Sequence, residues 1–249
     1  MRYFIELAYN GTNYHGWQNQ PNAISVQEVL EKALSTILGE TITVMGAGRT
    51  DAGVHAKQLF AHMDIDVAFK IDTLQYKLNS FLPKDVAIQS IFKVIPDAHA
   101  RFHATSRAYV YRIALRKSPF NFDQTYFLKQ SLDIDKLNQA TKILFDYTDF
   151  QCFSKSNTDV HTYNCDIMEA KWDVVEDEIH FTIKADRFLR NMVRAIVGTL
   201  INIGVGKLEV NDMHTIIQSK NRSEAGYSVP AKGLYLIKVE YPDTIKLND

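Results

Sequence analysis

Cysteine is scarce in this sequence, and long apolar runs are missing from it. The two cysteines, Cys152 and Cys165, form no Cys-x-x-Cys motif in a chain of 249 residues, which favours buried thiols over a disulfide framework or a structural zinc site. No run approaches the ~18 apolar residues that a membrane-spanning helix needs. Residues 1–5 lead directly into an expected strand and lack the layout of a signal peptide. We therefore expect a soluble protein of the cytoplasm that holds no metal.

The sequence also lacks an excess of charge of one sign. Its 28 Lys and Arg nearly balance its 29 Asp and Glu, and the formal net charge is −1, whereas a nucleic-acid-binding protein usually has a basic excess. Basic residues nevertheless gather in two short stretches, residues 101–117 and residues 187–194. Composition alone leaves two interpretations open, a localised basic groove or ordinary solvated surface charge.

Hydrophobic periodicity predicts a β-α-β-β-α-β order in the first part of the chain. Ser25 and Glu28 form a capping box ahead of apolar residues at helical spacing, and Gly39 is a typical helix stop. Alternating apolar residues predict strands on either side. The expected elements are a strand at 2–9, a helix at 26–37, strands at 41–45 and 59–65, a helix at 72–80 and a strand at 85–93.

The second part of the chain repeats this order. Its expected elements are a strand at 109–115, a helix at 133–145 that Asp133 caps, strands at 163–175 and 178–185, a helix at 189–200, an extra helix at 209–219 and a final strand at 233–241. The repetition predicts an α+β protein of two similar, ferredoxin-like subdomains, residues 1–105 and 106–249. We expect the functional site in a cleft between them.

The most unusual stretch is the glycine-rich segment of residues 46–55, Gly-Ala-Gly-Arg-Thr-Asp-Ala-Gly-Val-His. Glycine permits backbone angles that other residues avoid, so this segment predicts a tight loop between two strands that presents Arg49 and Asp51. It is not a dinucleotide-binding fingerprint, because Asp51 occupies the third glycine position. The chain also contains neither a P-loop nor a Gly-x-Ser-x-Gly elbow.

Two weaker patterns point to other chemistries. His99 and His103 are four residues apart, but Ala100 stands where a zinc protease requires Glu. The Asp64-Ile65-Asp66 segment follows an apolar strand and faintly resembles phosphatases with an aspartyl nucleophile. A Mg²⁺-dependent phosphotransferase that uses Asp64 therefore stays open as an alternative.

Four segments together resemble the tRNA pseudouridine synthase A family. They are residues 48–55 (Gly-Arg-Thr-Asp-Ala-Gly-Val-His), residues 100–104 with 107–111, residues 188–198 and residues 230–236, and they extend over nearly the whole chain. The resemblance implies a pseudouridine synthase fold with a central cleft, and isomerisation of uridine in tRNA without a cofactor. It further implies positions 38–40 of the anticodon stem-loop as targets and a homodimer as the assembly. One departure is Asp186-Arg187, where family members often carry a small or polar pair.

The resemblance also assigns catalytic roles. Asp51 is implied as the nucleophile, and whether it attacks C1′, adds to C6 or abstracts a proton stays open. Arg194 is implied as the cation that keeps this carboxylate ionised, against the alternative of an ordinary structural salt bridge. By helical phase, Arg187, Arg190 and Arg194 are expected to cluster on one face of the helix that carries the third family motif.

Further residues are implied in substrate binding. Tyr109 is the candidate for stacking on uracil, although an aromatic ring on a strand face that it shares with Tyr111 is more often part of a core. Arg49 is expected to hold the space that a flipped-out uridine vacates, or to grip its phosphate; the alternative is a cation that stabilises the loop. Leu234 either lines the uracil pocket or is a buried strand leucine.

The two basic stretches are expected to contact tRNA phosphates. Arg107 in the first stretch and Arg190 in the second are the residues assigned to this role. A non-catalytic tRNA-binding protein or chaperone of the same fold is the alternative function. The presence of both Asp51 and Arg194 favours the enzyme.

Overall fold

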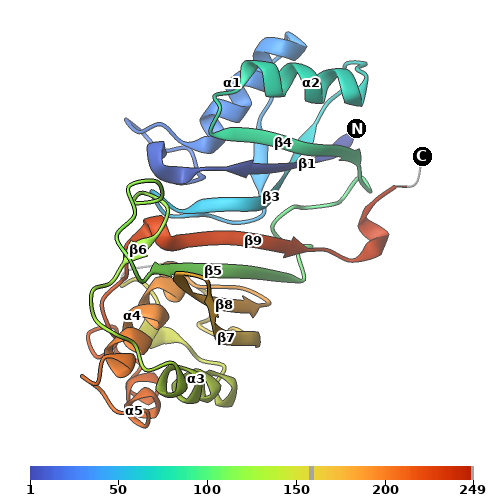
Figure 1. Ribbon diagram of the computed structural model, residues 1–249. Helices are drawn as coiled ribbons and strands as arrows, with labels where there is room; N and C mark the ends of the chain where they lie inside the picture. Colours follow the sequence, from blue (N-terminus) through green and yellow to red (C-terminus); the bar gives the residue numbers. More distant parts are fainter. Residues whose placement is uncertain (157–159, 248–249) are drawn as a thin grey trace. The chain divides into compact units, whose positions relative to one another are not determined.

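The computed structural model describes residues 1–156 and 160–247. The chain divides into two compact units. The first unit comprises residues 1–105 together with the segment that starts at Tyr235, and the second comprises residues 106–234. Figure 1 labels the elements.

The first unit contains a mixed sheet in the order β4-β1-β3-β9, with β2 paired to β3. β1 (Arg2–Tyr9) lies antiparallel to both β3 (His55–Asp64) and β4 (Val86–Lys93). β2 (Val44–Gly46) is also antiparallel to β3, whereas β9 (Leu234–Glu240) is parallel to it, with Tyr235 opposite His55. Up to β4 the elements follow the predicted β-α-β-β-α-β order.

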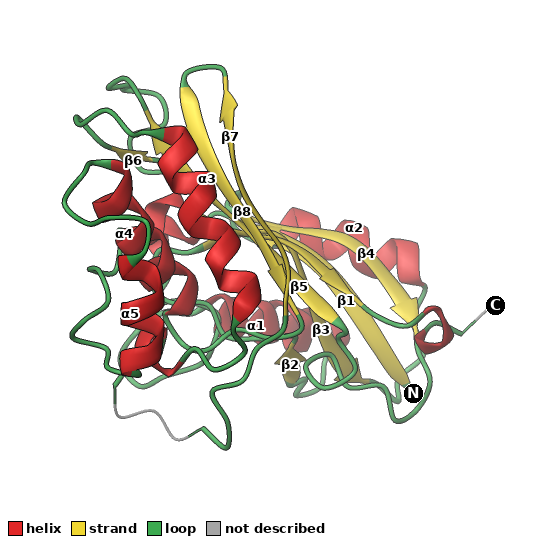
Figure 2. Cartoon of the chain, turned by 90° about the horizontal axis from the view of Figure 1, so that it is seen from below, coloured by secondary structure: helices red, strands yellow, loops and turns green. Residues whose placement is uncertain are grey.

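Two helices pack against each other on one side of this sheet, α1 (Val26–Leu38) and α2 (Ile71–Phe81) (Figure 2). α1 begins as the capping box predicts, because the Ser25 hydroxyl accepts a hydrogen bond from the Glu28 N–H at 3.1 Å. It ends at Gly39, whose φ of 76° lies in the left-handed region. Such a cap satisfies backbone groups that the helix itself leaves without partners. The predicted start and end of α1 are confirmed.

Aromatic rings on the first unit's sheet contact the segment that follows β9. The Phe4 ring centroid lies 5.1 Å from that of Tyr241, and the Phe60 centroid lies 5.3 Å from it. The Tyr241 hydroxyl also donates a 2.6 Å hydrogen bond to the Ala100 carbonyl. The prediction placed residues 235–249 in the second subdomain. The structure differs because β9 pairs with β3 and Tyr241 packs on Phe4.

The second unit contains an antiparallel sheet in the order β5-β8-β7. Its strands are β5 (Ser106–Ala114), β7 (Ile167–Val175) and β8 (Glu178–Ala185), and the short β6 (Tyr126–Phe127) runs parallel to β5. Its helices are α3 (Ile134–Lys142), α4 (Met192–Gly204) and α5 (Asp212–Ser219). The chain is therefore an α+β protein, as predicted.

In the second unit, α3 packs against both α4 and β7. The Trp172 indole N–H of β7 donates a 3.1 Å hydrogen bond to the Thr141 hydroxyl of α3. The Trp172 ring also lies 4.8 Å from Phe181 of β8. An indole that is buried with its N–H paired contributes apolar burial without leaving an unsatisfied donor.

Cys152 and Cys165 are buried, and neither forms a disulfide. Burial raises the pKa of each thiol to about 12, so neither is a reactive thiolate at neutral pH. Among the described residues, no helix has the length and apolar character required to cross a membrane.

Candidate active site

The predicted site residues fall in both units, and each group is described within its own unit. In the first unit, a loop of residues 47–54 connects β2 to β3 and carries Asp51. The Val54 N–H donates to the Asp51 carbonyl at 3.1 Å, which closes a turn directly after the carboxylate. Gly53 within this turn has a φ of 77°, so the left-handed angle expected of the glycine-rich segment occurs here.

Residues that precede α1 in the sequence contact this loop at Thr50 and stabilise it. The Tyr9 hydroxyl and the Thr50 hydroxyl lie 2.9 Å apart, and the Trp17 N–H donates to the Thr50 carbonyl at 3.4 Å. Gly16 approaches the same backbone so closely that a Cβ built on it would lie 2.2 Å from the Thr50 oxygen. The residue next to Asp51 is therefore fixed by side chain and backbone alike. No local pattern indicates these supporting residues, since only the fold brings residues 9–17 to the loop.

Asp51 and Arg49 differ in exposure. Asp51 is half-buried and Arg49 is exposed. A half-buried carboxylate can reach a bound ligand while part of its hydration shell is already removed, and an exposed guanidinium beside it is placed to contact a phosphate. These placements are compatible with the implied roles of both residues.

His55, which had no predicted role, anchors the C-terminal end of the loop. It is only 2% exposed, and its Nδ1 accepts a hydrogen bond from the Gly11 N–H at 3.0 Å. Its ring stacks on Tyr235 of β9 with a centroid separation of 4.5 Å. An imidazole used in this way supports the loop structurally, because its Nδ1 lone pair is already occupied.

In the second unit, Arg194 lies half-buried on α4. Its Nε donates a 2.7 Å hydrogen bond to the Val229 carbonyl, and the Val229 N–H donates to the Arg194 carbonyl at 3.2 Å. The Tyr111 hydroxyl donates to the neighbouring Pro230 carbonyl at 2.9 Å. Residues 229–230 are thus tied to both α4 and β5, and the Arg194 side chain is bonded to this segment through its Nε.

The predicted alignment of three arginines on one helical face is wrong. α4 begins only at Met192, so Arg187 and Arg190 lie in the preceding loop. The helix cannot extend further back because Asn191 has a left-handed φ of 68°, which interrupts a right-handed helix. The Asn191 amide donates a 2.6 Å hydrogen bond to the Ser228 hydroxyl, a contact that no local pattern indicates.

The Asp186-Arg187 pair has a structural role in this loop. The Asp186 carboxylate accepts hydrogen bonds from the N–H groups of Asp166 and Arg187, both at 2.7 Å. The Arg187 guanidinium donates to the Thr162 carbonyl at 3.2 Å. Arg107 of β5 donates to the Asp186 carbonyl at 2.8 Å, so part of its guanidinium serves the fold. Arg190, by contrast, is exposed.

Tyr109 and Leu234 complete the predicted set. Tyr109 is only half-buried on β5, and its ring meets Phe188 edge-on at 5.2 Å and 90°. Tyr111, two residues on, is fully buried. An edge-to-face partner fixes a ring in one orientation, which suits a stacking surface. Leu234 is 6% exposed at the start of β9, a burial that fits an ordinary strand leucine as well as a pocket wall.

The structure also bears on the alternative chemistries. Both Asp64 oxygens accept hydrogen bonds from Arg2, at 2.9 and 2.7 Å, and the bond with Arg2 lowers the pKa of this carboxyl. A carboxylate held by both oxygens in a bidentate ion pair is poorly disposed to act as a nucleophile. Within residues 1–156 and 160–247, no group of three or more His, Cys, Asp or Glu side chains is arranged to hold a metal ion.

The sequence is similar to those of known proteins over nearly the whole chain. The model of a family described as tRNA pseudouridine synthase matches residues 7–103 and 144–242. A protein of Bacteroides fragilis named tRNA pseudouridine synthase A is 54% identical over 247 residues, which cover 98% of this chain and 98% of that protein. A protein of the same name from Bacteroides thetaiotaomicron is 52% identical over 98% of this chain and 92% of its own length. Another from Porphyromonas gingivalis is 50% identical over 99% of this chain and 99% of its own length.

Proposed function

The chain belongs to the tRNA pseudouridine synthase family, and we propose on this premise that it isomerises uridine to pseudouridine in tRNA. The similarity extends over 98% of the chain and includes the loop that carries Asp51. The proposed mechanism rests on the geometry of that loop, in which Tyr9, Gly16 and Trp17 fix the backbone beside the Asp51 carboxylate.

The proposed reaction breaks the bond between N1 of uracil and C1′ of ribose and forms a bond between C5 and C1′. The detached base turns before it rejoins, C5 loses its proton and N1 gains one. No electrons leave the substrate, so atoms balance without an oxidant or a reductant. The chemistry needs a nucleophile or base at the glycosidic bond and stabilisation of the detached uracil.

We assign these tasks to residues of both units. Asp51 is the nucleophile, and Arg194 is the cation of the catalytic machinery. Tyr109 stacks on the uracil, with a ring orientation that Phe188 supports. Leu234 is assigned to the wall of the uracil pocket.

Recognition of the tRNA is proposed to rest on its shape and backbone. Arg49 contacts the phosphate or the vacated space beside the flipped-out uridine, and Arg107 and Arg190 contact phosphates. The proposed targets are positions 38–40 of the anticodon stem-loop, and adjacent positions on one stem favour readout of geometry over sequence. In this proposal each unit is a ferredoxin-like subdomain, and the enzyme acts as a homodimer.

The test is tritium release from tRNA labelled with [5-³H]uridine, with EDTA present and no added metal or nucleotide. Wild type should release tritium, and Asp51→Asn should not, because the amide is nearly isosteric but cannot act as a nucleophile. Asp72→Asn on the exposed side of α2 is the matched control and should retain wild-type turnover. Turnover by Asp51→Asn comparable to wild type would remove Asp51 from the mechanism. Tight tRNA binding without release by the wild type would favour the non-catalytic alternative.

A further inference from the structure

The loop of residues 98–104, which we call the imidazole loop, lies within the first unit at the opposite end of β3 from the loop that carries Asp51. The Ala100 N–H donates to Nδ1 of His62, near the C-terminal end of β3, at 3.1 Å. His55, at the start of β3, is seven residues away, and extended strand covers about 23 Å over that length. The imidazole loop is therefore remote from Asp51 but belongs to the same unit.

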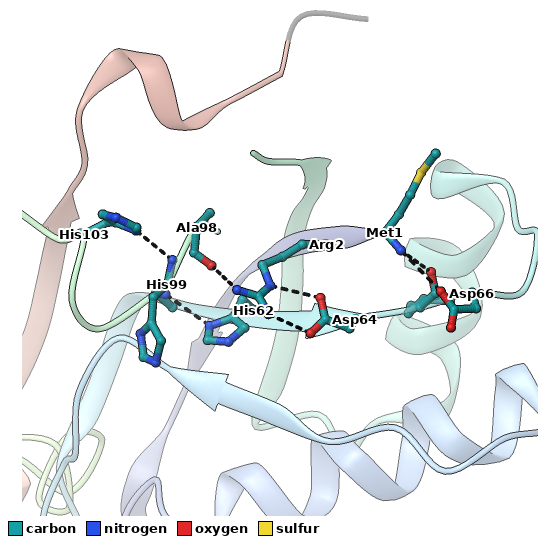
Figure 3. Close-up of polar contacts among 10 residues, drawn as sticks. Met1, Arg2, His62, Asp64, Asp66, Ala98, His99 and His103 are labelled. Carbon is teal, nitrogen blue, oxygen red and sulfur yellow. Dashed lines mark hydrogen bonds and ion pairs between the residues drawn. The ribbon is translucent and has the colours of Figure 1, made fainter. Parts of the chain in front are cut away.

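Three histidine rings, those of His62, His99 and His103, accept hydrogen bonds from backbone N–H groups of this loop; Figure 3 labels the three residues. Nδ1 of His103 accepts from the His99 N–H at 2.8 Å. Nδ1 of His99 in turn accepts from the N–H groups of Arg101 and Phe102, at 3.1 and 3.4 Å. With the bond from Ala100 to His62, each ring serves as an acceptor at Nδ1, which requires the neutral tautomer with its proton on Nε2.

Further bonds hold the carbonyl groups of the same loop. The Arg2 guanidinium, which also binds Asp64 through both oxygens, donates to the Ala98 carbonyl at 2.9 Å. The Tyr241 hydroxyl donates to the Ala100 carbonyl at 2.6 Å. A loop whose N–H groups from Ala98 to His103 all have partners, and three of whose carbonyl groups do, loses little entropy when it binds a ligand.

This rigid backbone displays an aromatic ring and a cation on the surface. The Phe102 side chain is 73% exposed, and the Arg101 guanidinium lies over its ring, 5.5 Å from the centroid. The His99 ring lies on Phe102 as well, with 4.3 Å between centroids. Contacts with Arg101 and His99 thus hold the exposed Phe102 ring in place, with a cation directly beside it.

We propose that Arg101 and Phe102 form a tRNA-binding site remote from the catalytic loop, in which Phe102 stacks on a base or ribose and Arg101 contacts a phosphate. The proposed site rests on the proposed function, because that function has tRNA as its substrate. Aromatic faces combined with arginine are the usual means of binding nucleic acid without reading its sequence. The basic stretch of residues 101–117 was expected to contact phosphates, and the structure singles out the two residues that a rigid loop holds outward.

RNA is favoured over a protein partner by the composition of the loop. The neighbouring Ala98 and Ala100 are buried, so Phe102 is not part of an extended apolar patch on this loop, the kind of patch that marks a protein interface. A cation beside an aromatic ring matches the alternation of phosphate and base along an RNA strand. Binding at this distance from the reacting uridine would be equal in the ground state and the transition state, so it should lower KM without changing kcat.

The experiment measures the Kd of unmodified tRNA by fluorescence anisotropy over a range of salt concentrations, together with KM and kcat from tritium release. Phe102→Ala should weaken binding and raise KM about tenfold, the loss expected for one stacked base, and leave kcat unchanged. Arg101→Ala should reduce the slope of log K against log salt by about 1. Phe102→Trp should bind at least as tightly as wild type, a result that a folding defect cannot produce.

Tyr76→Ala is the matched control, because Tyr76 is 74% exposed on α2 of the same unit. It should leave Kd within about twofold of the wild-type value. Wild-type Kd for both Phe102→Ala and Arg101→Ala, or an equal loss for Tyr76→Ala, would overturn the proposed site. An altered oligomeric state for Phe102→Ala with unchanged Kd would overturn it in favour of a protein interface. If these variants bind normally while wild type releases tritium, this site alone fails; if wild type neither binds nor releases, the proposed function fails with it.

Discussion

Replacing Gly16 by alanine probes how the loop around Asp51 is held. Gly16 has a φ of +88°, and a Cβ built there would lie 2.2 Å from the Thr50 oxygen and 3.1 Å from the Asp51 carbonyl carbon. Since real Cβ contacts essentially never fall below 3.0 Å, the backbone beside Asp51 has to move by about 0.8 Å or more. Packed backbone does not absorb such a shift locally.

The size of the effect follows from this displacement. Misplacing a catalytic group by ~1 Å costs on the order of 10²-fold in rate, so we expect kcat of Gly16→Ala to fall by about 10- to 100-fold. The left-handed backbone adds a destabilisation of about 1–2 kcal/mol, because the alanine Cβ is crowded there. Single-turnover tritium release measures the first quantity, and urea unfolding measures the second.

Gly39 provides the control for backbone strain alone. Its φ is +76°, but a Cβ built on it would meet nothing within 4 Å. Gly39→Ala should therefore lose a similar free energy of unfolding and keep wild-type kcat. The reasoning is refuted if Gly16→Ala turns over as fast as wild type, or if Gly39→Ala loses kcat to the same extent.

Three further changes have definite expected outcomes. Burial, with Arg2 and His99 nearby, lowers the pKa of His62 to about 4. Between about pH 7 and 5 the unfolded chain therefore takes up a proton that the folded chain does not. The free energy of unfolding should fall by roughly 1–2 kcal/mol over this range. His62→Asn, which keeps an oxygen acceptor near the position of Nδ1, should flatten this dependence in urea unfolding, and parallel curves would contradict it. Arg194→Ala should lower kcat by about 100-fold or more with tRNA Kd little changed, and a loss confined to Kd would count against its catalytic role. Ser25→Ala should cost about 1 kcal/mol of stability through loss of the N-cap without affecting kcat, as thermal unfolding and tritium release can verify.

Features set by neighbours in the sequence were predictable. The Ser25 cap, the apolar spacing of α1 and the Gly39 stop are all local, and the helix begins and ends where they indicate. The glycine-rich loop between β2 and β3 was found for the same reason. Its position in the chain and its turn at Gly53 depend on residues within the loop itself.

Features set by distant contacts were not predictable. The helical pattern extended back to Leu189, but the left-handed Asn191 that starts α4 late is held by Ser228. Gly16 looks like an ordinary loop glycine until the fold brings it against Thr50. The final strand was recognised as a strand, yet nothing in its alternation says that it pairs with β3. The proposed roles of Asp51 and Arg194 came from resemblance to a family and remain proposals here.

The return of β9 to the first unit has a consequence for synthesis on the ribosome. The second unit is inserted between β4 and β9, so the first unit contains the earliest residues to be made and also some of the last. Until Tyr235 and Tyr241 emerge, His55 lacks its stacking partner and the Phe4 and Phe60 rings lack the tyrosine that packs on them. A nascent chain that ends before Tyr235 therefore leaves this aromatic surface of the first unit without its cover, and such a surface draws chaperones and invites aggregation.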